Sequence, residues 1–256
     1  MRLFTFLFYI IWMFLFNIIT YSTAFTTLIL SYLLPDSKGP FIRKCVSIWS
    51  RIGFALALSP VEVRGRENLI DEAGLIICNH QSSLDILACS GFFPKDFLFF
   101  SKKEVFNLPF IGQLMKKMGY ISVDRKKPKK AAASVLQALQ KIKDKNNIII
   151  FPEGSRNKNP KEMLPLKPGA ILMARQGKVP ILPVIIYGTK QILPDILGFY
   201  MKPTKVIMQI LPAILPENSM HPIHCKSIAE EDLMLENLRG KLSEVYNKLA
   251  DEMEQK

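Results

Sequence analysis

Hydrophobic residues dominate the first part of the chain without interruption. No formally charged side chain occurs from Leu3 to Leu34, a run of 32 residues rich in Phe, Leu, Ile and Tyr. As a continuous helix at about 1.5 Å per residue, this run would reach about 48 Å, beyond the roughly 30 Å hydrocarbon core of a bilayer. The pattern therefore predicts a helix that spans a membrane with overhang, or one that bends.

A second apolar stretch runs from Cys45 to Val61 and contains one charge, Arg51. It is separated from the first by the turn-like sequence Pro35-Asp36-Ser37-Lys38-Gly39-Pro40. Two helices in a hairpin, one spanning or deeply inserted and one lying at the membrane interface, account for both lengths and for the arginine. We therefore expect residues 1–60 to form a membrane-associated hairpin.

A cleaved secretory signal is the alternative interpretation of the first run. Arg2 precedes it, and small residues occur at 22–24. An apolar signal core usually spans about 7–15 residues, however, and this run continues well past such a site. Because Lys38, Arg43 and Lys44 follow the run, the positive-inside tendency places the rest of the chain in the cytoplasm.

After Pro60, short apolar runs alternate with longer stretches of helical periodicity. Helices are predicted over Lys129–Lys145 and Pro168–Gln176. Strands are predicted over Gly74–Asn79, Phe97–Phe100, Tyr120–Val123, Asn147–Phe151, Ile181–Ile186 and Val206–Leu211. Strands rich in Ile and Val with helical connections predict an α/β fold over residues 61–256, with a largely parallel central sheet flanked by helices. The pattern does not give the order of the strands.

A charged helix is predicted near the C-terminus, beginning close to Ala229. Its apolar positions recur at spacings of three and four residues: Leu235, Leu238, Leu242, Val245 and Leu249. We expect this amphipathic helix to pack on the α/β domain. A partner-binding or coiled-coil helix is the alternative, although barely three heptads are present.

Composition excludes a disordered chain and leaves few candidates for metal binding. Hydrophobic residues make up 49% and charged residues 22% of the 256 positions. The four cysteines, Cys45, Cys78, Cys89 and Cys225, show no C-x-x-C spacing, which favours a reducing compartment over a disulfide framework. His221, His224 and Cys225 lie close together, but no further ligand pattern completes a metal site, so no metal is expected.

The positive charge of the chain is concentrated in one segment. The whole sequence carries a formal charge of +12, and Lys95 to Lys167 alone holds 17 Lys or Arg against 6 Asp or Glu, a net of +11. A nucleic-acid surface and a surface for anionic lipid headgroups or phosphorylated substrates both fit this excess. The apolar N-terminal run favours the lipid interpretation.

Polar clusters follow three of the predicted strands, where the sites of such sheets gather. They are His80-Gln81-Ser82-Ser83-Leu84-Asp85, then Asp124-Arg125, then Pro152-Glu153-Gly154-Ser155-Arg156. His80 and Asp85 would stand about 140° apart on a regular helix, so they can touch only if a turn intervenes. Ser82 or Ser83 can cap a helix that begins near Leu84 and supply that turn.

A contact between Asp85 and one imidazole nitrogen would orient His80 as a general base. A structural histidine in a loop is the alternative. The motifs of serine hydrolases, P-loop NTPases and zincins are absent from the sequence. The attacking oxygen would then come from the substrate, as in acyl transfer to a phosphorylated alcohol.

Four sequence blocks in this order resemble those of the glycerolipid acyltransferases, specifically the bacterial 1-acyl-sn-glycerol-3-phosphate acyltransferases. The first is Asn79-His80-Gln81-Ser82-Ser83-Leu84-Asp85, similar to N-H-x-S-x-x-D. The second comprises Lys102-Lys103-Glu104-Val105-Phe106, Pro109-Phe110-Ile111-Gly112 and Gly119 to Arg125. The third is Phe151-Pro152-Glu153-Gly154-Ser155-Arg156 and the fourth Val179-Pro180-Ile181-Leu182-Pro183-Val184. The likeness does not extend convincingly past Tyr187.

The resemblance implies a role for each matching position. His80 would be the general base and Asp85 its orienting partner. The glycerol phosphate acceptor would be bound by Lys102, Arg125, Glu153, Gly154, Ser155 and Arg156. Glu153 would pair with an arginine or bind the acceptor's hydroxyl rather than its phosphate. Pro180 and Pro183 would border the acyl-donor groove, although they fit the punctuation of an edge strand equally well.

The resemblance also implies a reaction and a location. An acyl group would pass from an acyl-CoA or acyl carrier protein thioester to the sn-2 hydroxyl of 1-acyl-sn-glycerol 3-phosphate, without a metal or other cofactor. Membrane lipids and lysophosphatidic acid would be the partners, and the bacterial inner membrane the location, with the catalytic domain cytoplasmic. A same-family enzyme acting on glycerol 3-phosphate or another lysophospholipid, and a membrane-tethered module binding nucleic acid or acidic partners, are the alternatives.

Overall fold

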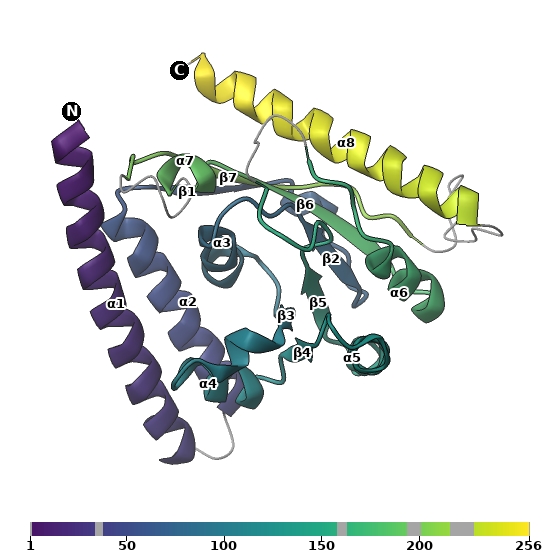
Figure 1. Ribbon diagram of the computed structural model, residues 1–256, viewed down its shortest axis with the longest axis horizontal. Coiled ribbons are helices and arrows are strands. Elements are labelled where there is room, and N and C mark those ends of the chain that lie inside the picture. The colour runs from purple at the N-terminus through teal and green to yellow at the C-terminus, as the bar shows by residue number, and fades with distance from the viewer. Residues whose placement is uncertain (1, 34–37, 158–162, 194–200, 216–227, 256) are drawn as a thin grey trace.

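The computed structural model describes residues 2–33, 38–157, 163–193, 201–215 and 228–255 (Figure 1). The α-helices are α1 Arg2–Leu33, α2 Lys38–Leu56, α3 Leu84–Phe92, α4 Ile111–Lys117, α5 Pro128–Lys143, α6 Gly169–Gly177, α7 Thr189–Ile192 and α8 Ile228–Glu254. The strands are β1 Val61–Arg64, β2 Leu75–Cys78, β3 Phe97–Lys102, β4 Ile121–Val123, β5 Asn147–Ile150, β6 Ile181–Tyr187 and β7 Val206–Ile210.

The strands form one sheet in the order β1-β7-β6-β2-β5-β3-β4. From β6 to β4 all neighbours are parallel. The β7 strand runs antiparallel to β6 and carries β1 parallel to itself at the sheet edge. The largely parallel α/β sheet expected from the sequence is therefore confirmed, and it ends in two reversed strands.

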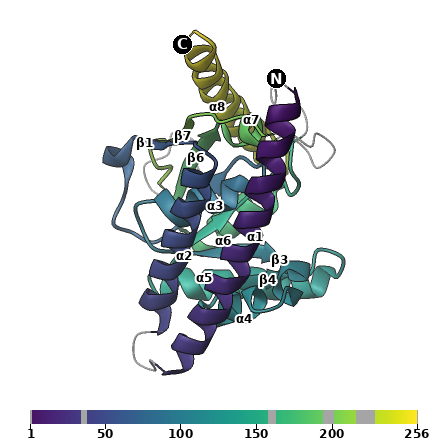
Figure 2. The same cartoon turned by 90° about the vertical axis from the view of Figure 1, so that its left-hand side faces the viewer.

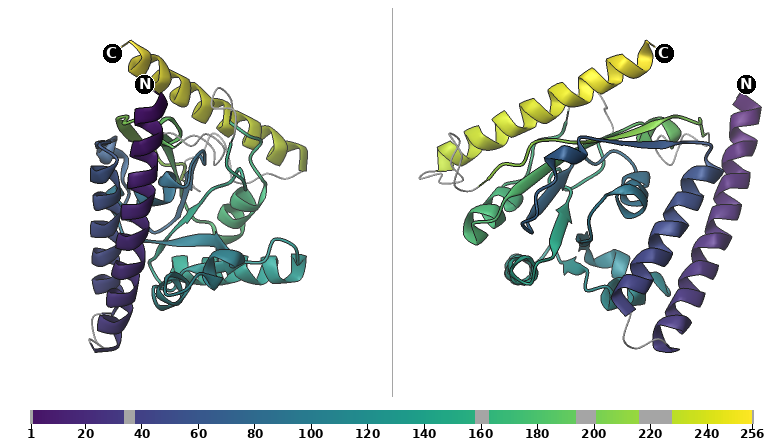
Figure 3. Two further views of the ribbon diagram at one scale, coloured as in Figure 1. Left: turned by 60° about the vertical axis from the view of Figure 1, so that its left-hand side comes forward. Right: turned by 180° about the vertical axis from the view of Figure 1, so that it is seen from behind.

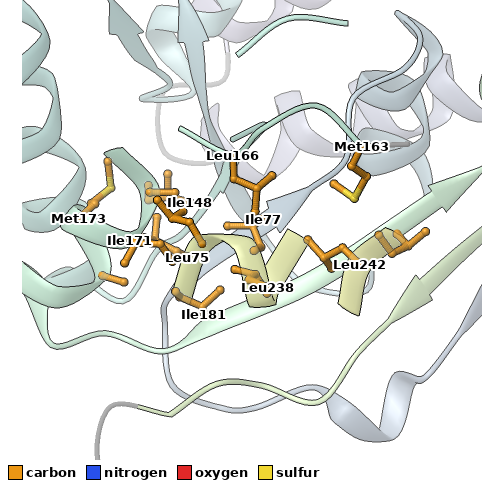
Figure 4. Close-up of a cluster of buried hydrophobic side chains, with 14 of the residues drawn as sticks. Leu75, Ile77, Ile148, Met163, Leu166, Ile171, Met173, Ile181, Leu238 and Leu242 are labelled. Carbon is orange, nitrogen blue, oxygen red and sulfur yellow. The ribbon is translucent and has the colours of Figure 1, made fainter. Parts of the chain in front are cut away.

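Alternating side chains of the strands supply the two faces of this sheet. In β2, Leu75 and Ile77 join a core covered by α5, α6 and α8, whereas Ile76 and Cys78 join a core covered by α3 with parts of α1 and α2. Figure 4 shows the first core, where Leu238 and Leu242 of α8 face strand side chains. Each fully buried Leu or Ile contributes about 1.5–3 kcal/mol to folding.

The two N-terminal helices lie side by side against the α3 face (Figures 1 and 2). The Trp12 indole N–H donates to the Gly53 carbonyl at 3.1 Å, and Trp49 donates to Thr20 at 2.9 Å, so these contacts join α1 to α2. Ser50 donates to the Leu87 carbonyl and ties α2 to α3. The predicted helical hairpin thus packs directly on the α/β body.

Only one side of α1 is covered. Among the described residues, α1 is the one helix long and apolar enough to cross a membrane, over Leu3–Leu33. Its uncovered side carries large apolar side chains, including Phe4, Phe14 and Leu33, which are 74%, 65% and 69% exposed. The α1 helix is continuous over its described length, Arg2–Leu33.

The C-terminal helix α8 lies on the other side of the sheet from α2 (Figure 3). Leu235, Leu238, Leu242 and Leu249 are buried against the sheet, as their spacing predicted. Tyr246 is buried with them, one position after the partly buried Val245. The interpretation of this segment as an amphipathic helix packed on the domain is confirmed.

The six predicted strands are all present, and in the described ranges β1 is the further strand that the sequence pattern did not reveal. Its four residues, Val61-Glu62-Val63-Arg64, alternate between apolar and charged side chains, but the segment is too short to stand out. Val61 also ends the apolar stretch that begins in the preceding helix. The strand exists because β7 supplies its hydrogen-bonding partner.

Candidate active site

The segments that follow β2, β4 and β5 meet at one edge of the sheet, because these strands are parallel and adjacent or nearly so. His80 and Asp85 follow β2, Arg125 follows β4, and Glu153 follows β5. Asn79 fixes the first of these segments, since its side chain exchanges two hydrogen bonds with the backbone of Ile186 at 2.7 and 2.9 Å. The three polar clusters singled out in the sequence therefore share this edge.

His80 and Asp85 are in direct contact, with Nδ1 of the imidazole 2.9 Å from Oδ2 of the carboxylate. His80 lies in the loop and Asp85 in the first turn of α3, which begins at Leu84 as expected. The Ser82 hydroxyl accepts the Leu84 N–H at 3.3 Å and closes the intervening turn. Asp85 is fully buried, whereas the His80 side chain keeps 16% exposure, so the imidazole can reach a substrate.

Further donors hold the Asp85 carboxylate in place. The backbone N–H groups of Gln81 and Ser82 donate to the same Oδ2 at 2.7 and 2.9 Å, and the Thr189 hydroxyl donates to Oδ1 at 2.5 Å. Thr189 is fully buried at the start of α7, two residues after β6 ends. Thr189 was not among the site residues predicted from the sequence. Its position just after a predicted strand is the signal that could have identified it.

Glu153 differs from its expected role as a partner of an arginine or of the acceptor. Its Oε1 accepts the His80 backbone N–H at 2.7 Å, and its Oε2 accepts the Leu164 N–H at 3.1 Å. The side chain is 3% exposed, and this burial raises its pKa above the ordinary value, against the opposing effect of the two N–H donors. Glu153 thus ties the loop after β5 to the backbone of His80.

Cationic side chains surround Gly154. Arg125 donates through Nη1 to the Gly154 carbonyl, and the Lys167 side chain lies so close that a Cβ at Gly154 would come within 2.7 Å of its Cε. Gly154 also has a φ of +74°, which favours glycine. Arg156 donates to the Ser83 hydroxyl at 2.9 Å, which places its guanidinium beside the His80 loop.

The remaining predicted acceptor residues lie along the same edge. Ser155 is exposed next to Gly154. Lys102 ends β3 in register with Val123, two residues before Arg125, and its ammonium stands 3.8 Å from the Glu104 carboxylate. Its neighbour Lys103 instead forms an ion pair with Asp124 at 2.7 Å.

An apolar cavity of about 160 Å³ lies between the N-terminal helices and the sheet. Its walls include Thr27 of α1, Trp49 of α2, Ile86 of α3, Phe99 of β3 and Leu114 of α4. Ile86 is the residue after Asp85. The His80 ring stacks on Phe151 with centroids 4.2 Å apart, and Phe151 in turn stacks on Phe99 at 6.3 Å. Stacked rings therefore connect Phe99 in the cavity wall to His80.

Pro180 and Pro183 lie at the start of β6, in the middle of the sheet. Pro180 precedes β6 and accepts the Leu75 N–H, at the end of the sheet where β2 and β6 begin. Pro183 lies inside β6, which is buried between β2 and β7, so the edge-strand interpretation of these prolines is wrong. Pro180 is thus separated from the His80 edge by the length of β6, whereas Pro183 pairs with Ile77, three residues before His80.

Among the described residues, no group of three or more His, Cys, Asp or Glu side chains could hold a metal ion. His221, His224 and Cys225, the one metal candidate in the sequence, lie outside the described residues. The cysteines that the structure describes, Cys45, Cys78 and Cys89, are free thiols.

The comparisons with known proteins identify the class to which this fold and site correspond. The family model described as Acyltransferase matches residues 60–187, which is half of the chain, so the chain belongs to the acyltransferase family. The resemblance found in the four sequence blocks is confirmed. The matched region includes the strands β1 to β6 and ends just before Thr189.

The chain is similar to several proteins named 1-acyl-sn-glycerol-3-phosphate acyltransferase. It is 36% identical over 160 residues to that of Saccharomyces cerevisiae, covering 62% of this chain and 52% of the relative. It is 36% identical over 121 residues to that of Helicobacter pylori, covering 47% and 51%. The chain therefore spans about half the length of the curated relatives it matches.

The fold has a close counterpart among solved structures. The 1-acyl-sn-glycerophosphate (LPA) acyltransferase of Thermotoga maritima superposes with a TM-score of 0.77, over 96% of this chain and 98% of that one. Sequence identity is 24%, so the likeness establishes the fold, including the arrangement of the α/β sheet with its N-terminal helices.

Proposed function

We propose that this protein is a 1-acyl-sn-glycerol-3-phosphate acyltransferase. It would transfer a fatty acyl group from an acyl thioester to the sn-2 hydroxyl of 1-acyl-sn-glycerol 3-phosphate, giving phosphatidic acid and a free thiol. The names of its relatives support this acceptor. The observation that carries the proposal is the 2.9 Å contact between His80 and a buried Asp85 beside the arginines of two neighbouring loops.

The proposed mechanism uses His80 as the general base. With Nδ1 held by Asp85, the neutral imidazole can take the proton of the sn-2 hydroxyl on Nε2. The hydroxyl oxygen forms its bond to the thioester carbonyl carbon, and the carbon–sulfur bond then breaks. The imidazolium returns its proton to the departing thiolate. The buried carboxylate stabilises the imidazolium while the proton is held there.

The cationic groups around Gly154 fit the phosphate of the acceptor. The guanidinium of Arg125 contacts the Gly154 carbonyl, and that of Arg156 contacts Ser83, three residues after His80. A planar guanidinium suits bidentate binding of phosphate, and Lys167 adds a point charge. We propose that Arg125, Arg156 and Lys167 bind the phosphate. Lys102 and Ser155 would line the edge of this phosphate site. Glu153 would position the loop rather than contact substrate.

The apolar cavity offers a place for the fatty acyl chain. Its wall residues come from α1 and α2 as well as from the α/β body, and Phe99 of the wall is connected to the ring of His80, in the His80–Asp85 dyad, through Phe151. We propose that this cavity forms the acyl-donor groove, which the sequence resemblance had placed beside Pro180 and Pro183. The thioester carries the acyl group in activated form, so the proposed reaction requires no metal or redox cofactor. Either acyl-CoA or an acyl carrier protein thioester could donate it.

The location follows from the uncovered side of α1. Residues 1–60 would anchor the protein in a membrane, and residues 61–256 would form the catalytic domain at the membrane surface. We propose the bacterial inner membrane, with the catalytic domain cytoplasmic, because Arg43 and Lys44 lie in α2 just beyond the long apolar helix. Both lipid substrate and lipid product would remain in the bilayer.

The test is an acceptor panel on the purified protein in phospholipid vesicles. One labelled acyl donor is offered with 1-acyl-sn-glycerol 3-phosphate, glycerol 3-phosphate or another lysophospholipid, and the donor is given in turn as acyl-CoA and acyl carrier protein thioester. We expect the highest kcat/KM with 1-acyl-sn-glycerol 3-phosphate. A preference for another acceptor would assign the protein to a different activity of the family, and no acyl transfer to any acceptor would overturn the proposal.

His80→Ala tests the mechanism in the same assay. We expect kcat to fall by about 10²–10⁴, the usual contribution of a general base, with unchanged vesicle binding and circular dichroism. Asp85→Asn, which preserves shape but removes the carboxylate, should cost about as much. Asp71→Asn makes the same change at a fully exposed side chain and serves as the control. Near-native turnover of His80→Ala would contradict the mechanism.

A further inference from the structure

The C-terminal helix α8 contacts the loop that carries His80. The Tyr246 hydroxyl donates to Oε1 of Gln81 at 2.9 Å, across a separation of 165 residues. Both side chains are only 3% exposed. Tyr246 lies outside the region matched by the family model, which ends at residue 187. The loop next to the catalytic histidine is therefore held from an element beyond that region.

Gln81 links this contact to the dyad. It directly follows His80, and its own backbone N–H donates to Oδ2 of Asp85 at 2.7 Å. This is the same oxygen that contacts Nδ1 of His80. The N–H of Gln81 belongs to the peptide that joins His80 to Gln81. Fixing the Gln81 side chain thus limits the rotation of this peptide, which donates to Asp85.

The phenol of Tyr246 is well suited to act as a permanent donor. Burial raises the pKa of Tyr246 to about 12, so the hydroxyl keeps its proton over the working range of an enzyme. Its ring packs on Tyr187 at the end of β6, with centroids 5.2 Å apart. The Gln191 side chain also interacts with both tyrosines.

A second contact from α8 reaches the other loop of the site. Nε of Arg239 donates to the Met163 carbonyl at 2.9 Å. The next residue, Leu164, donates its N–H to Glu153, whose other oxygen accepts the His80 backbone N–H. Hydrogen bonds from α8 therefore lead to both sides of His80, one through Gln81 and one through Glu153.

We propose that α8 is a positioning element of the active site and that Tyr246 is a positioning residue, acting through Gln81 on the His80–Asp85 pair. The inference rests on the proposed acyl transfer. Proton transfer requires the imidazole within about 0.5 Å of its productive place, so loosening the Gln81 peptide slows chemistry rather than substrate binding. The effect should accordingly fall on kcat and spare KM.

The experiment compares Tyr246→Phe with the wild-type full-length protein in vesicles. Removing the hydroxyl should lower kcat about tenfold, the effect of one neutral hydrogen bond, with KM for acceptor and donor within about twofold. Tyr187→Phe is the matched control, because it removes a neighbouring buried phenol oxygen that also interacts with Gln191. It should leave kcat within about twofold of the wild type.

A double-mutant cycle with Gln81→Met tests the route of the effect. Methionine keeps the length of the side chain but has no amide. If Tyr246 acts through Gln81, adding Tyr246→Phe to Gln81→Met should change kcat by less than about twofold. If the fold-losses in kcat of the two single variants multiply in the double variant, the proposal is overturned. A wild-type kcat in Tyr246→Phe would overturn it as well.

Hydrogen exchange separates this inference from the proposed function, because it needs no turnover. The backbone amides of residues 79–86 should exchange about tenfold faster in Tyr246→Phe than in the wild type or in Tyr187→Phe. Unchanged exchange there would refute the positioning role even in an active enzyme. If the wild type transfers no acyl group but exchange responds as expected, the proposed function fails and the role of α8 in holding the loop stands.

Discussion

Within the described part of the chain, four hydrogen-bond donors meet at the Asp85 carboxylate, from two segments more than a hundred residues apart. The His80, Gln81 and Ser82 donors are local, and the hydroxyl of Thr189 comes from 104 residues away. A fully buried carboxylate needs such donors, because an oxygen without a partner costs about 1–3 kcal/mol. Thr189 is therefore expected to matter for the dyad although it contacts no substrate in the proposed mechanism.

Thr189→Val should lower kcat about tenfold and leave both KM values nearly unchanged, because valine keeps the shape but removes the donor to Oδ1 of Asp85. Steady-state kinetics in vesicles would measure this. Thr189→Ser retains the hydroxyl and should restore most of the turnover. Equal losses in the valine and serine variants would show that the methyl packing of Thr189, rather than its hydrogen bond, is what matters.

The sequence predicts the local part of this arrangement and not the distant part. His80 and Asp85 are five residues apart, so turn geometry and capping serines were sufficient to expect their contact. The donors from Thr189 and Tyr246 depend on how β6 and α8 pack, which no local pattern specifies. Glu153 was assigned to substrate for the same reason, because its backbone partners, His80 and Leu164, become visible only in the folded chain.

At the scale of elements, hydrophobic runs predicted six of the seven strands found in the described residues, and the main helices. The order of the strands and the reversal at β7 were beyond sequence reasoning, because both depend on which strands find each other in space. The short strand β1 shows how such an edge is secured. Its Arg64 forms ion pairs with Glu62 at 2.7 Å and with Glu252 of α8 at 2.6 Å, so it connects the sheet edge to the last helix.

Glu62→Gln should make the stability of this edge depend less on pH. Hydrogen bonds from Arg64 and then Lys205 lower the pKa of Glu62 to about 2. A carboxylate with a depressed pKa in the folded state contributes stability above its ordinary value of 4.5, and this contribution is lost as pH falls toward about 2. Because Glu62 is 38% exposed, the difference in Tm from the wild type should be a few degrees at pH 7.

Thermal unfolding in detergent between pH 7 and pH 2 would follow this difference. We expect the Tm of Glu62→Gln to approach that of the wild type as the pH falls below 4.5. A difference that stayed constant down to pH 2 would mean that the loss at neutral pH comes from packing rather than from the carboxylate charge.

At the scale of the whole molecule, the apolar surface lies on α1 and the polar chemistry lies at the carboxyl edge of the sheet. The apolar cavity is bounded by both parts, with Thr27 from α1 and Phe99 from β3 in its wall. The two N-terminal helices therefore pack against the α/β body and share a cavity with it, rather than being joined to it by a linker alone. Composition and charge predicted the two parts, but not the cavity between them, since that depends on the packing of α1 and α2.

Phe14→Lys should weaken membrane association. Phe14 is 65% exposed on α1, and a lysine near the centre of a membrane helix costs about 2.5–3.5 kcal/mol, or about a hundredfold in partitioning. Vesicle flotation at high salt would measure the bound fraction. Leu136→Lys is the control, because Leu136 is 66% exposed on α5 and should not affect binding. Equal binding of the Phe14 variant and the wild type would argue against insertion of α1.

The hydrogen bond between Tyr246 and Gln81 also orders events during synthesis. The ribosome makes α1 before the histidine loop, and Tyr246 is made 165 residues after Gln81. The histidine loop cannot acquire this contact until the segment that holds Tyr246 has been translated. Because α1 has left the ribosome by then, the proposed membrane helix can meet a bilayer before the loop that carries His80 has gained all its contacts.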